Sequence, residues 1–299
     1  MCNLRANFLL KAGRWAARLT LLAVVAGGCS CAIKRTVQVS LPQQPAGPPK
    51  QASVAELVRD VDAWSERIDT IEATVDFKAA TGSAYSGVIN QYHDVGGFIL
   101  VKKPSMIRMI GQAPVVKTEI FDMVSNAQEF RVYIPPKNKF IVGETTYQGP
   151  VKNSLENLRP QHILSALLVP PVNQAVEKVF VEETQTPAHQ YYILTVVEPN
   201  KAGQLELSRK IWFDRSDLRI SRLALYGPGG SLLESVQYAN YRDFQQIKYP
   251  AEITVSRPSN GYTLSISIVS AKFNRPIPPE KFVLKKPANA TLVKLGGAQ

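Results

Sequence analysis

The sequence predicts a mainly β protein with some α, in which one strongly curved antiparallel sheet wraps around one or two helices. Apolar residues alternate with period two over most of the chain after Ile71, and tight-turn residues separate the alternating segments. Two segments have helical periodicity instead. More than ten consecutive strands cannot stay one flat sheet, so the sheet must curl. Amphipathic helices need an apolar surface to cover, and the inside of a curled sheet provides it.

The first 28 residues have the features of a secretory signal peptide. Residues 1–28 contain no acidic side chain, and an apolar run at residues 19–26 precedes small residues. The basic residues before this run are Arg5, Lys11, Arg14 and Arg18. The run is far shorter than the ~20 apolar residues that a membrane-spanning helix needs.

Cys29 follows Gly27 and Gly28, and this pattern resembles the lipobox of bacterial lipoproteins. The resemblance implies that Cys29 becomes the first residue of the mature chain and is acylated. An ordinary secretory signal and acylation at Cys31 are the alternatives. Residues 29–52 are therefore interpreted as a lipidated cysteine and a Pro-rich tether. Pro-rich segments favour an extended conformation of roughly 3 Å per residue, so residues 36–51 would span up to about 50 Å.

The domain that follows the tether is predicted to occupy residues 53–287, with a tail at residues 288–299. Its first helix is signalled by the capping-box spacing of Ser53 and Glu56 and by apolar residues at helical spacing up to Ile71. A second helix is expected at residues 159–169, where Pro160 suits the first turn and two later prolines stop the helix.

The remaining elements are predicted strands separated by turn residues. The Asn260-Gly261 pair is the strongest of the hairpin signals. Before the second helix, strands are predicted at residues 71–80, 87–93, 97–102, 106–111, 115–124, 129–134 and 139–144. After it, they are predicted at residues 175–183, 191–197, 205–214, 219–226, 232–242, 249–257 and 262–273.

Composition argues against nucleic-acid binding and against a fold held by cysteines. The chain has 35 Lys and Arg against 24 Asp and Glu, and four of the basic residues lie in the signal, so the mature chain keeps a net charge of +7. The charge is diffuse, without a basic block or an aromatic-flanked basic motif, although it is compatible with an anionic membrane surface. All three cysteines precede residue 32, which leaves no disulfide framework or thiolate metal site in the domain.

No catalytic or metal-binding motif stands out, and the chain is predicted not to be an enzyme and to need no cofactor or metal. The three histidines, His93, His162 and His189, have no partner at metal-ligand spacing. Neither a nucleophile elbow nor a phosphate-binding loop is present. A hydrolase of envelope lipids remains an alternative, because a Ser, a His and an acid can still meet in space.

Apolar surface is the remaining candidate for function. The candidate residues lining an acyl-chain cavity are Ile107, Met109, Phe121, Met123, Leu164 and Leu168. Alternation places Ile107 and Met109 on one face of their strand, and Met with Phe forms an adaptable lining. The alternative is that the same residues are core beneath the helices, and a half-open sheet with the helices as a lid would allow both roles. The turn that contains Pro114, Val115 and Val116 is unusual because turn tips are normally polar. It is either a candidate protruding finger or a tip buried against a neighbouring loop.

The order of several short motifs resembles the LolA/LolB superfamily of periplasmic lipoprotein carriers and outer-membrane lipoprotein receptors. The resemblance covers about residues 53–287. The signal, lipobox, tether and capped helix come before the matching segments in the chain. The matching segments are residues 71–77, 103–108, 133–138, 211–214, 218–220, 249–253 and 277–282.

This resemblance implies an unclosed antiparallel barrel, a half-barrel plugged by helices, whose apolar cavity binds the acyl chains of lipoproteins or phospholipid. The implied partners are a periplasmic carrier protein and the outer membrane, reached through the N-terminal lipid. Ser30 after Cys29 favours the periplasmic face of the outer membrane. In the receptor branch a hairpin loop carries a protruding apolar residue, which here corresponds to Val115. The alternative is a structural or stress-sensing lipoprotein that has the same fold, binds a protein partner and transfers no lipid.

Overall fold

The computed structural model describes residues 48–83, 88–91, 95–145 and 160–295. The predicted signal peptide, the lipidation site Cys29 and most of the tether lie outside these residues, as does His93. Within the described tether end, the backbone N–H of Lys50 donates to the carbonyl of Arg215 at 2.7 Å. The tyrosine hydroxyl of Tyr192 donates to Gln51 Oε1 at 2.8 Å. The end of the tether is thus fastened to the domain.

The described strands form one 15-stranded sheet with two unpaired outer edges, so the sheet is not closed. Its order is β15-β7-β6-β5-β4-β3-β1-β14-β13-β12-β11-β10-β9-β8, and the short β2 pairs with β1. The first half comprises β1 (Thr70–Ser83), β2 (Val88–Gln91), β3 (Val95–Lys102), β4 (Met106–Gln112), β5 (Glu119–Ser125), β6 (Glu129–Ile134) and β7 (Lys139–Glu144). The second comprises β8 (Lys178–Gln185), β9 (Gln190–Pro199), β10 (Leu205–Asp214), β11 (Arg219–Tyr226), β12 (Leu232–Phe244), β13 (Ile247–Arg257) and β14 (Tyr262–Phe273), while the final strand β15 (Thr291–Leu295) pairs with β7 at the outer edge of the first half.

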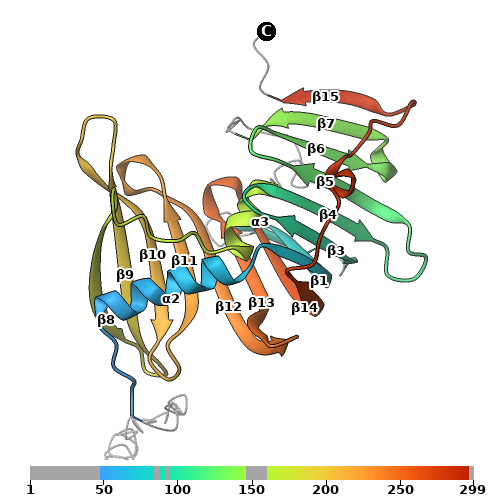
Figure 1. Cartoon of the computed structure of the whole chain (residues 1–299). Coiled ribbons are helices and arrows are strands. Elements are labelled where there is room, and N and C mark those ends of the chain that lie inside the picture. The colour runs from blue at the N-terminus through green and yellow to red at the C-terminus, as the bar shows by residue number, and fades with distance from the viewer. Residues whose placement is uncertain (1–47, 84–87, 92–94, 146–159, 296–299) are drawn as a thin grey trace, which may run out of the picture. The chain divides into compact units, whose positions relative to one another are not determined.

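The pairing of β1 with β14 joins the two halves of the sheet. It runs from Ile71 opposite Phe273 to Thr81 opposite Tyr262, with one bulge. Apart from the pairings of β1 with β3 and of β7 with β15, each half is built from strands that are neighbours in sequence. The chain leaves β7 near one edge of the sheet and re-enters it at β8, the opposite edge. Between them lies α3 (Pro160–Leu167), on the inner side of the curve (Figure 1).

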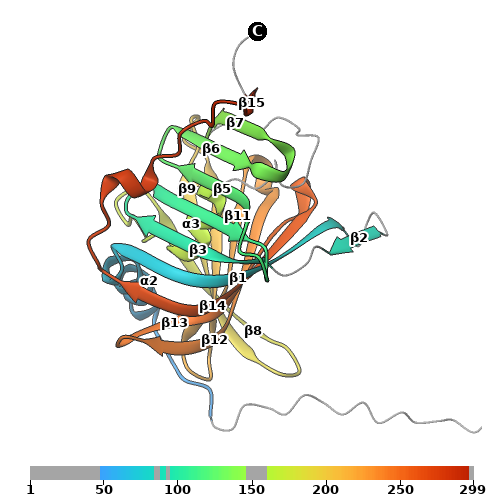
Figure 2. The same ribbon diagram turned by 90° about the vertical axis from the view of Figure 1, so that its right-hand side faces the viewer.

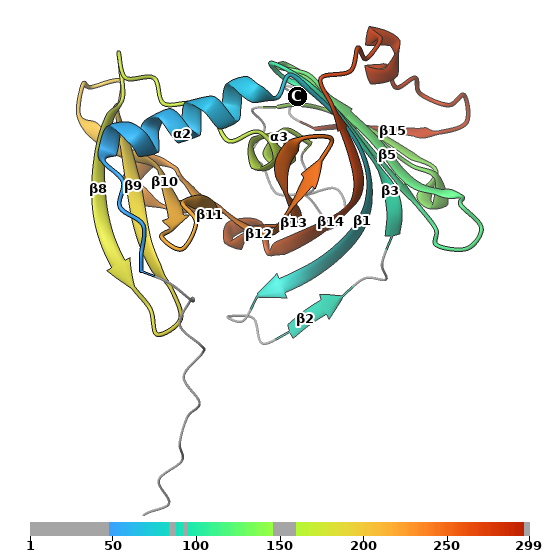
Figure 3. The same cartoon turned by 60° about the horizontal axis from the view of Figure 1, so that its bottom comes forward.

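The first helix, α2 (Val54–Arg67), begins with the predicted capping box. Ser53 Oγ accepts a hydrogen bond from the Glu56 N–H at 3.3 Å, and Glu56 Oε2 accepts one from the Ser53 N–H at 2.7 Å. These bonds satisfy amide donors that have no partner inside the helix. The helix buries Leu57, Val58 and Val61 against the sheet. Figure 3 shows α2 lying across the opening of the curved sheet, with α3 inside it.

The structure confirms the predicted fold class, a half-barrel plugged by helices. One continuous apolar cluster fills the space between the inner face of the sheet and the two helices. It takes side chains from both helices and from both halves of the sheet. No helix in the described part of the chain combines the length and the apolar character needed to cross a bilayer.

The C-terminal segment covers the outer face of the first half of the sheet, as the red segment in Figure 2 illustrates. Arg108 Nη1 donates to the carbonyl of Lys281 at 2.8 Å, and Arg131 Nη1 donates to the carbonyl of Leu284 at 3.3 Å. A second, small apolar cluster forms beneath this segment around Val124 and Phe140. Strand β5 is consequently buried on both faces.

Two sequence expectations need correction at their boundaries. The strand predicted at residues 115–124 begins only at Glu119, because residues 113–118 form a turn in which Lys117 has a φ of 54°. The sheet also continues beyond residue 287, since β15 pairs in parallel with β7. Only five residues long and largely exposed, β15 carries too little alternation to be recognised from sequence.

Candidate functional site

The residues predicted to line an acyl-chain cavity come together on the inner face of the sheet. Ile107 and Met109 on β4 and Phe121 and Met123 on β5 are all buried, and α3 packs against both strands. Leu164 on α3 is partly buried and Leu168 directly after it is buried in the same apolar cluster. In this closed form the six residues serve as core. Their role as a lipid-contacting surface remains a prediction that requires the helices to move.

Two buried tyrosines fasten the C-terminal end of α3 to the sheet. Tyr238 Oη donates to the carbonyl of Ala166 at 2.9 Å, and Tyr249 Oη donates to the carbonyl of Leu167 at 2.7 Å. These carbonyls belong to the last turn of the helix, where no helical N–H group is available to donate a hydrogen bond to them. Burial raises the pKa of both phenols, which keeps them protonated as donors.

A buried ion pair lies beside the same helix. Glu234 on β12 is fully buried, and its Oε2 accepts a hydrogen bond from Arg257 Nη1 at 2.8 Å. Ser165 Oγ on α3 lies 3.5 Å from Glu234 Oε1. Burial raises the pKa of Glu234, and the neighbouring Arg257 and the Ser165 hydroxyl counteract part of this effect. The pair connects β12 and β13 with α3 through polar contacts that a movement of the helix would strain.

The segment that follows α3 is fastened by polar contacts on both sides. Arg209 Nη2 on β10 donates to the carbonyl of Pro171 at 2.8 Å and to Glu177 Oε2 at 2.9 Å. From the other side, the backbone N–H of Val172 donates to Asp62 Oδ1 on α2 at 2.8 Å. The two helices are therefore linked through one short connection, so that a displacement of α3 would be transmitted to α2.

The apolar turn between β4 and β5 protrudes into solvent. Val115 is 90% exposed and Val116 is 70% exposed, and Pro114 is exposed as well. The alternative of a tip buried against a neighbouring loop is therefore wrong for this structure. The turn is closed by two backbone hydrogen bonds between Ala113 and the segment that follows the tip, at 2.9 and 3.1 Å. The exposed branched side chains on this turn form a small apolar projection.

A hollow of about 210 Å³ lies between α2 and the adjoining ends of β10 and β11, with β12 and β13 contributing further residues. Its rim carries basic side chains, among them Arg67 on the last turn of α2 and Lys248 on β13. The aromatic rings of Trp64 and Tyr241 line it, and their centroids lie 5.8 Å apart in an edge-on arrangement. In the sequence, Trp64 is one of the apolar residues at helical spacing between Ser53 and Ile71, and this pattern does not indicate the hollow. The elements that form the hollow are distant in sequence, so no local pattern indicates it.

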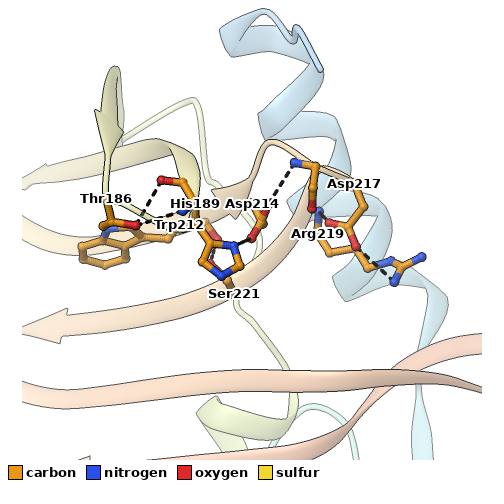
Figure 4. A network of polar contacts seen from close by, with 8 residues as sticks. Thr186, His189, Trp212, Asp214, Asp217, Arg219 and Ser221 are labelled. Atoms are coloured by element: carbon orange, nitrogen blue, oxygen red, sulfur yellow. Dashed lines mark hydrogen bonds and ion pairs between the residues drawn. The ribbon is translucent and has the colours of Figure 1, made fainter. Parts of the chain in front are cut away.

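Polar contacts at one end of the second half of the sheet involve one of the three histidines. Figure 4 shows His189, in the turn between β8 and β9, with its Nδ1 2.7 Å from Asp214 Oδ2. Ser221 Oγ donates to the carbonyl of Trp212 at 3.3 Å, and within the described residues no serine hydroxyl bonds to His189. His189 is exposed and lies apart from the predicted cavity residues. His162 lies in the first turn of α3. Over the described ranges, no cluster of three or more His, Cys, Asp or Glu side chains is arranged to hold a metal ion.

Comparison with known proteins gives matches by structure only. No family model and no curated protein sequence matches the chain. A DUF1329 family protein from Desulfovibrio piger has a TM-score of 0.51 at 12% identity, over 76% of this chain and 94% of that one. A LolA superfamily protein from Nitrosomonas europaea has a TM-score of 0.49 at 12% identity, over 78% of this chain and 99% of that one. A domain described as a putative outer membrane lipoprotein-sorting protein, from Vibrio parahaemolyticus, has a TM-score of 0.48 at 13% identity, over 76% of this chain and 94% of that one.

At these identities the likeness concerns the fold and carries no information on ligand or activity. The similarity to the Desulfovibrio piger protein covers nearly the whole of that chain. It agrees with the open, curled sheet that the strand order of this protein establishes.

Proposed function

We propose that this chain is a non-enzymatic lipid-binding lipoprotein of the bacterial outer membrane. In this proposal the inner surface of the half-barrel holds the acyl chains of lipoproteins or of phospholipid, and the protein acts in lipoprotein localisation or transfer. Cys29 supplies the lipid anchor on the periplasmic face of the outer membrane, and a periplasmic carrier protein delivers the cargo.

One observation supports this proposal above the others. The apolar cluster lies between a sheet with two open edges and two helices that pack on it, of which α3 is also held by two tyrosine hydrogen bonds. Displacement of the helices would expose a continuous apolar surface that takes side chains from both halves of the sheet. Lipid would then replace the helices as the cover of the same surface.

The free energy gained when an acyl chain is buried is offset by the free energy cost of displacing the helices. Each buried CH₂ group contributes about 0.8 kcal/mol, so a long acyl chain would gain roughly 10 kcal/mol or more on burial. Lifting α2 and α3 exposes apolar side chains and costs a comparable amount, because the same surface loses its cover. Binding and release can therefore proceed by exchange of apolar contacts without a cofactor.

The filled interior also supports a second candidate function. Ile107, Met109 and Met123 are buried in the closed form. A half-barrel that never opens would act as a structural or stress-sensing lipoprotein with a protein partner. The two functions differ in whether lipid enters the interior.

Native mass spectrometry separates the two functions. The chain from Gln51 onward, which lacks the proposed lipid anchor, is purified from periplasm without detergent, then incubated with phospholipid or with a triacylated peptide. Lipid binding predicts a bound mass that matches one of these molecules. A chain that remains free of ligand after both incubations would contradict the lipid-binding function and support the closed form.

A further inference from the structure

The hollow beside α2 carries a combination of groups that the acyl-chain function does not use. Its lining includes three basic side chains, Arg67, Arg219 and Lys248, and one carboxylate, Asp60. Phe213 and Ile220, which also line it, belong to the large apolar core cluster. The hollow is therefore charged at its rim and apolar at its floor. A ligand that matches it has a charged group joined to an apolar one.

The three basic groups retain capacity to bind an anion. Arg219 Nη1 lies 3.1 Å from Asp217 Oδ2, and its guanidinium has further N–H donors. Figure 4 shows these two side chains together. Lys248 lies 3.6 Å from Asp243, and both side chains are exposed, so this pair is weak. Arg67 forms no ion pair within the described part of the chain. Guanidinium and ammonium groups in this arrangement suit the oxygens of a phosphate.

Asp60 adds a negative group to the same hollow. It lies one helical turn before Trp64 and two turns before Arg67, so the three share one face of α2. Burial raises the pKa of Asp60, and the nearby Arg59 and Arg67 partly oppose this shift. Asp60 forms no ion pair among the described residues. Asp60 is exposed, so its carboxylate is accessible to the positive group of a ligand that binds in the hollow.

The aromatic lining of the hollow is packed against the apolar interior. The Trp64 ring stacks on Tyr249 with centroids 5.5 Å apart, and Tyr249 lies 5.1 Å from Phe273. This row of rings runs from the hollow beneath α2 to the central strands. Trp64 Nε1 is buried without a hydrogen-bond acceptor within the described residues.

We propose that this hollow binds the head group of a zwitterionic phospholipid-like amphiphile. Oxygens of its phosphate diester accept hydrogen bonds from Arg67, Arg219 and Lys248, and its ammonium group donates to Asp60. The head group binds with α2 in place, and the acyl chains reach the apolar interior beside Trp64 when α3 is displaced. A volume of about 210 Å³ accommodates a head group and not a whole lipid. This inference rests on the proposed function and specifies the class of lipid.

Calorimetric titration of the full chain with short-chain lipids below their micellar concentration tests the proposal. The probes are dihexanoyl phosphatidylethanolamine, dihexanoyl phosphatidylglycerol, dihexanoylglycerol and inorganic phosphate. We expect Arg67→Gln with Lys248→Gln to weaken both phospholipids about tenfold or more and to leave dihexanoylglycerol unchanged. We expect Asp60→Asn to weaken only the phosphatidylethanolamine. The control, Arg242→Gln with Lys272→Gln, removes the same charge at exposed positions outside the hollow.

The outcomes distinguish failure of this inference from failure of the proposed function. If the double variant binds phospholipid as tightly as the unaltered chain, or if dihexanoylglycerol binds as tightly as the phospholipids, the head-group site is refuted while acyl binding stands. If inorganic phosphate alone binds with the affinity of the phospholipids, the hollow is a site for free anions and the lipid assignment is overturned. If the unaltered chain binds none of the lipids, the acyl-chain function itself fails.

Discussion

Tyr249 on β13 donates a hydrogen bond of 2.7 Å from its hydroxyl to the carbonyl of Leu167 at the end of α3. The phenol is fully buried, and its ring also stacks beneath Trp64 of α2. One side chain of the sheet therefore contacts both helices. Any movement of either helix away from the sheet changes the surroundings of this tyrosine.

Removal of the hydroxyls that hold α3 should loosen the helix. In Tyr249→Phe with Tyr238→Phe, two buried carbonyls lose their donors, and we expect the free energy of unfolding to fall by roughly 1–3 kcal/mol for each. Acyl exchange should accelerate because the closed form is less favoured. Tyr133→Phe, on the outer face of the sheet, is the control. Urea unfolding and lipid exchange rates are the measurements, and unchanged exchange in a destabilised variant would remove α3 from the opening mechanism.

The protruding turn is expected to act in transfer without contributing to the fold. Val115→Glu places a charge on a side chain that is 90% exposed, so the free energy of unfolding should change by less than about 0.5 kcal/mol. Acyl transfer to membranes should be impaired, since a charged tip does not enter an apolar environment. Val269→Glu, at an exposed valine of β14, is the matched control. Normal transfer by Val115→Glu would exclude the turn as the transfer element.

The anchoring prediction concerns the first cysteine after the signal. Cys29→Ser should prevent acylation and release the chain from the membrane fraction, because the thiol is the group that carries the lipid. Cys31→Ser serves as its control and should leave acylation and membrane association unchanged. Mass spectrometry of the mature N-terminus and membrane fractionation are the measurements. The opposite result for the two variants would assign the lipid to Cys31.

Glu234 should make the stability of the domain depend on pH. Its pKa lies above the ordinary value of 4.5 in the folded chain because burial disfavours the charged form. The folded state therefore binds the proton more tightly than the unfolded state. The contribution of Glu234 to the free energy of unfolding is fully present below a pH of about 4.5. It is lost as the pH rises through the raised pKa of the folded chain. In urea unfolding across this range, Glu234→Gln should lack this decline, and an equal decline in the variant would assign it to another group.

Gly111 lies at the base of the protruding turn, and the ring of Phe121 occupies the space that a side chain at this position would need. A Cβ at this position would lie 2.2 Å from the ring carbon Cε1, so Gly111→Ala must displace a buried aromatic side chain. We expect a loss of about 1–3 kcal/mol in the free energy of unfolding. At Gly96 the nearest atom would lie 3.6 Å from the new Cβ, so Gly96→Ala is the control with little effect. Equal stability of the two variants would show that Phe121 repacks without strain.

The elements that depend on neighbouring residues could be read from the sequence. The capping box of α2, the exact extents of β10, β11 and β14, and the turn at Asn260-Gly261 all follow from local signals. So does the alternation that points Ile107 and Met109 inward. These features arise from hydrogen bonds and side-chain spacing within a few residues, so the order of residues in the sequence is enough to predict them.

Contacts between distant segments were decided by the tertiary structure. The pairing of β1 with β14, the parallel addition of β15 and the bonds from Tyr238 and Tyr249 to α3 join residues that are 72 or more positions apart. The hollow around Trp64 draws on α2 and four strands for the same reason. The sequence by itself determined which faces are apolar and where the chain turns. Only the curvature of the sheet decided which of those faces meet, because it depends on all the strands packing together around the helices.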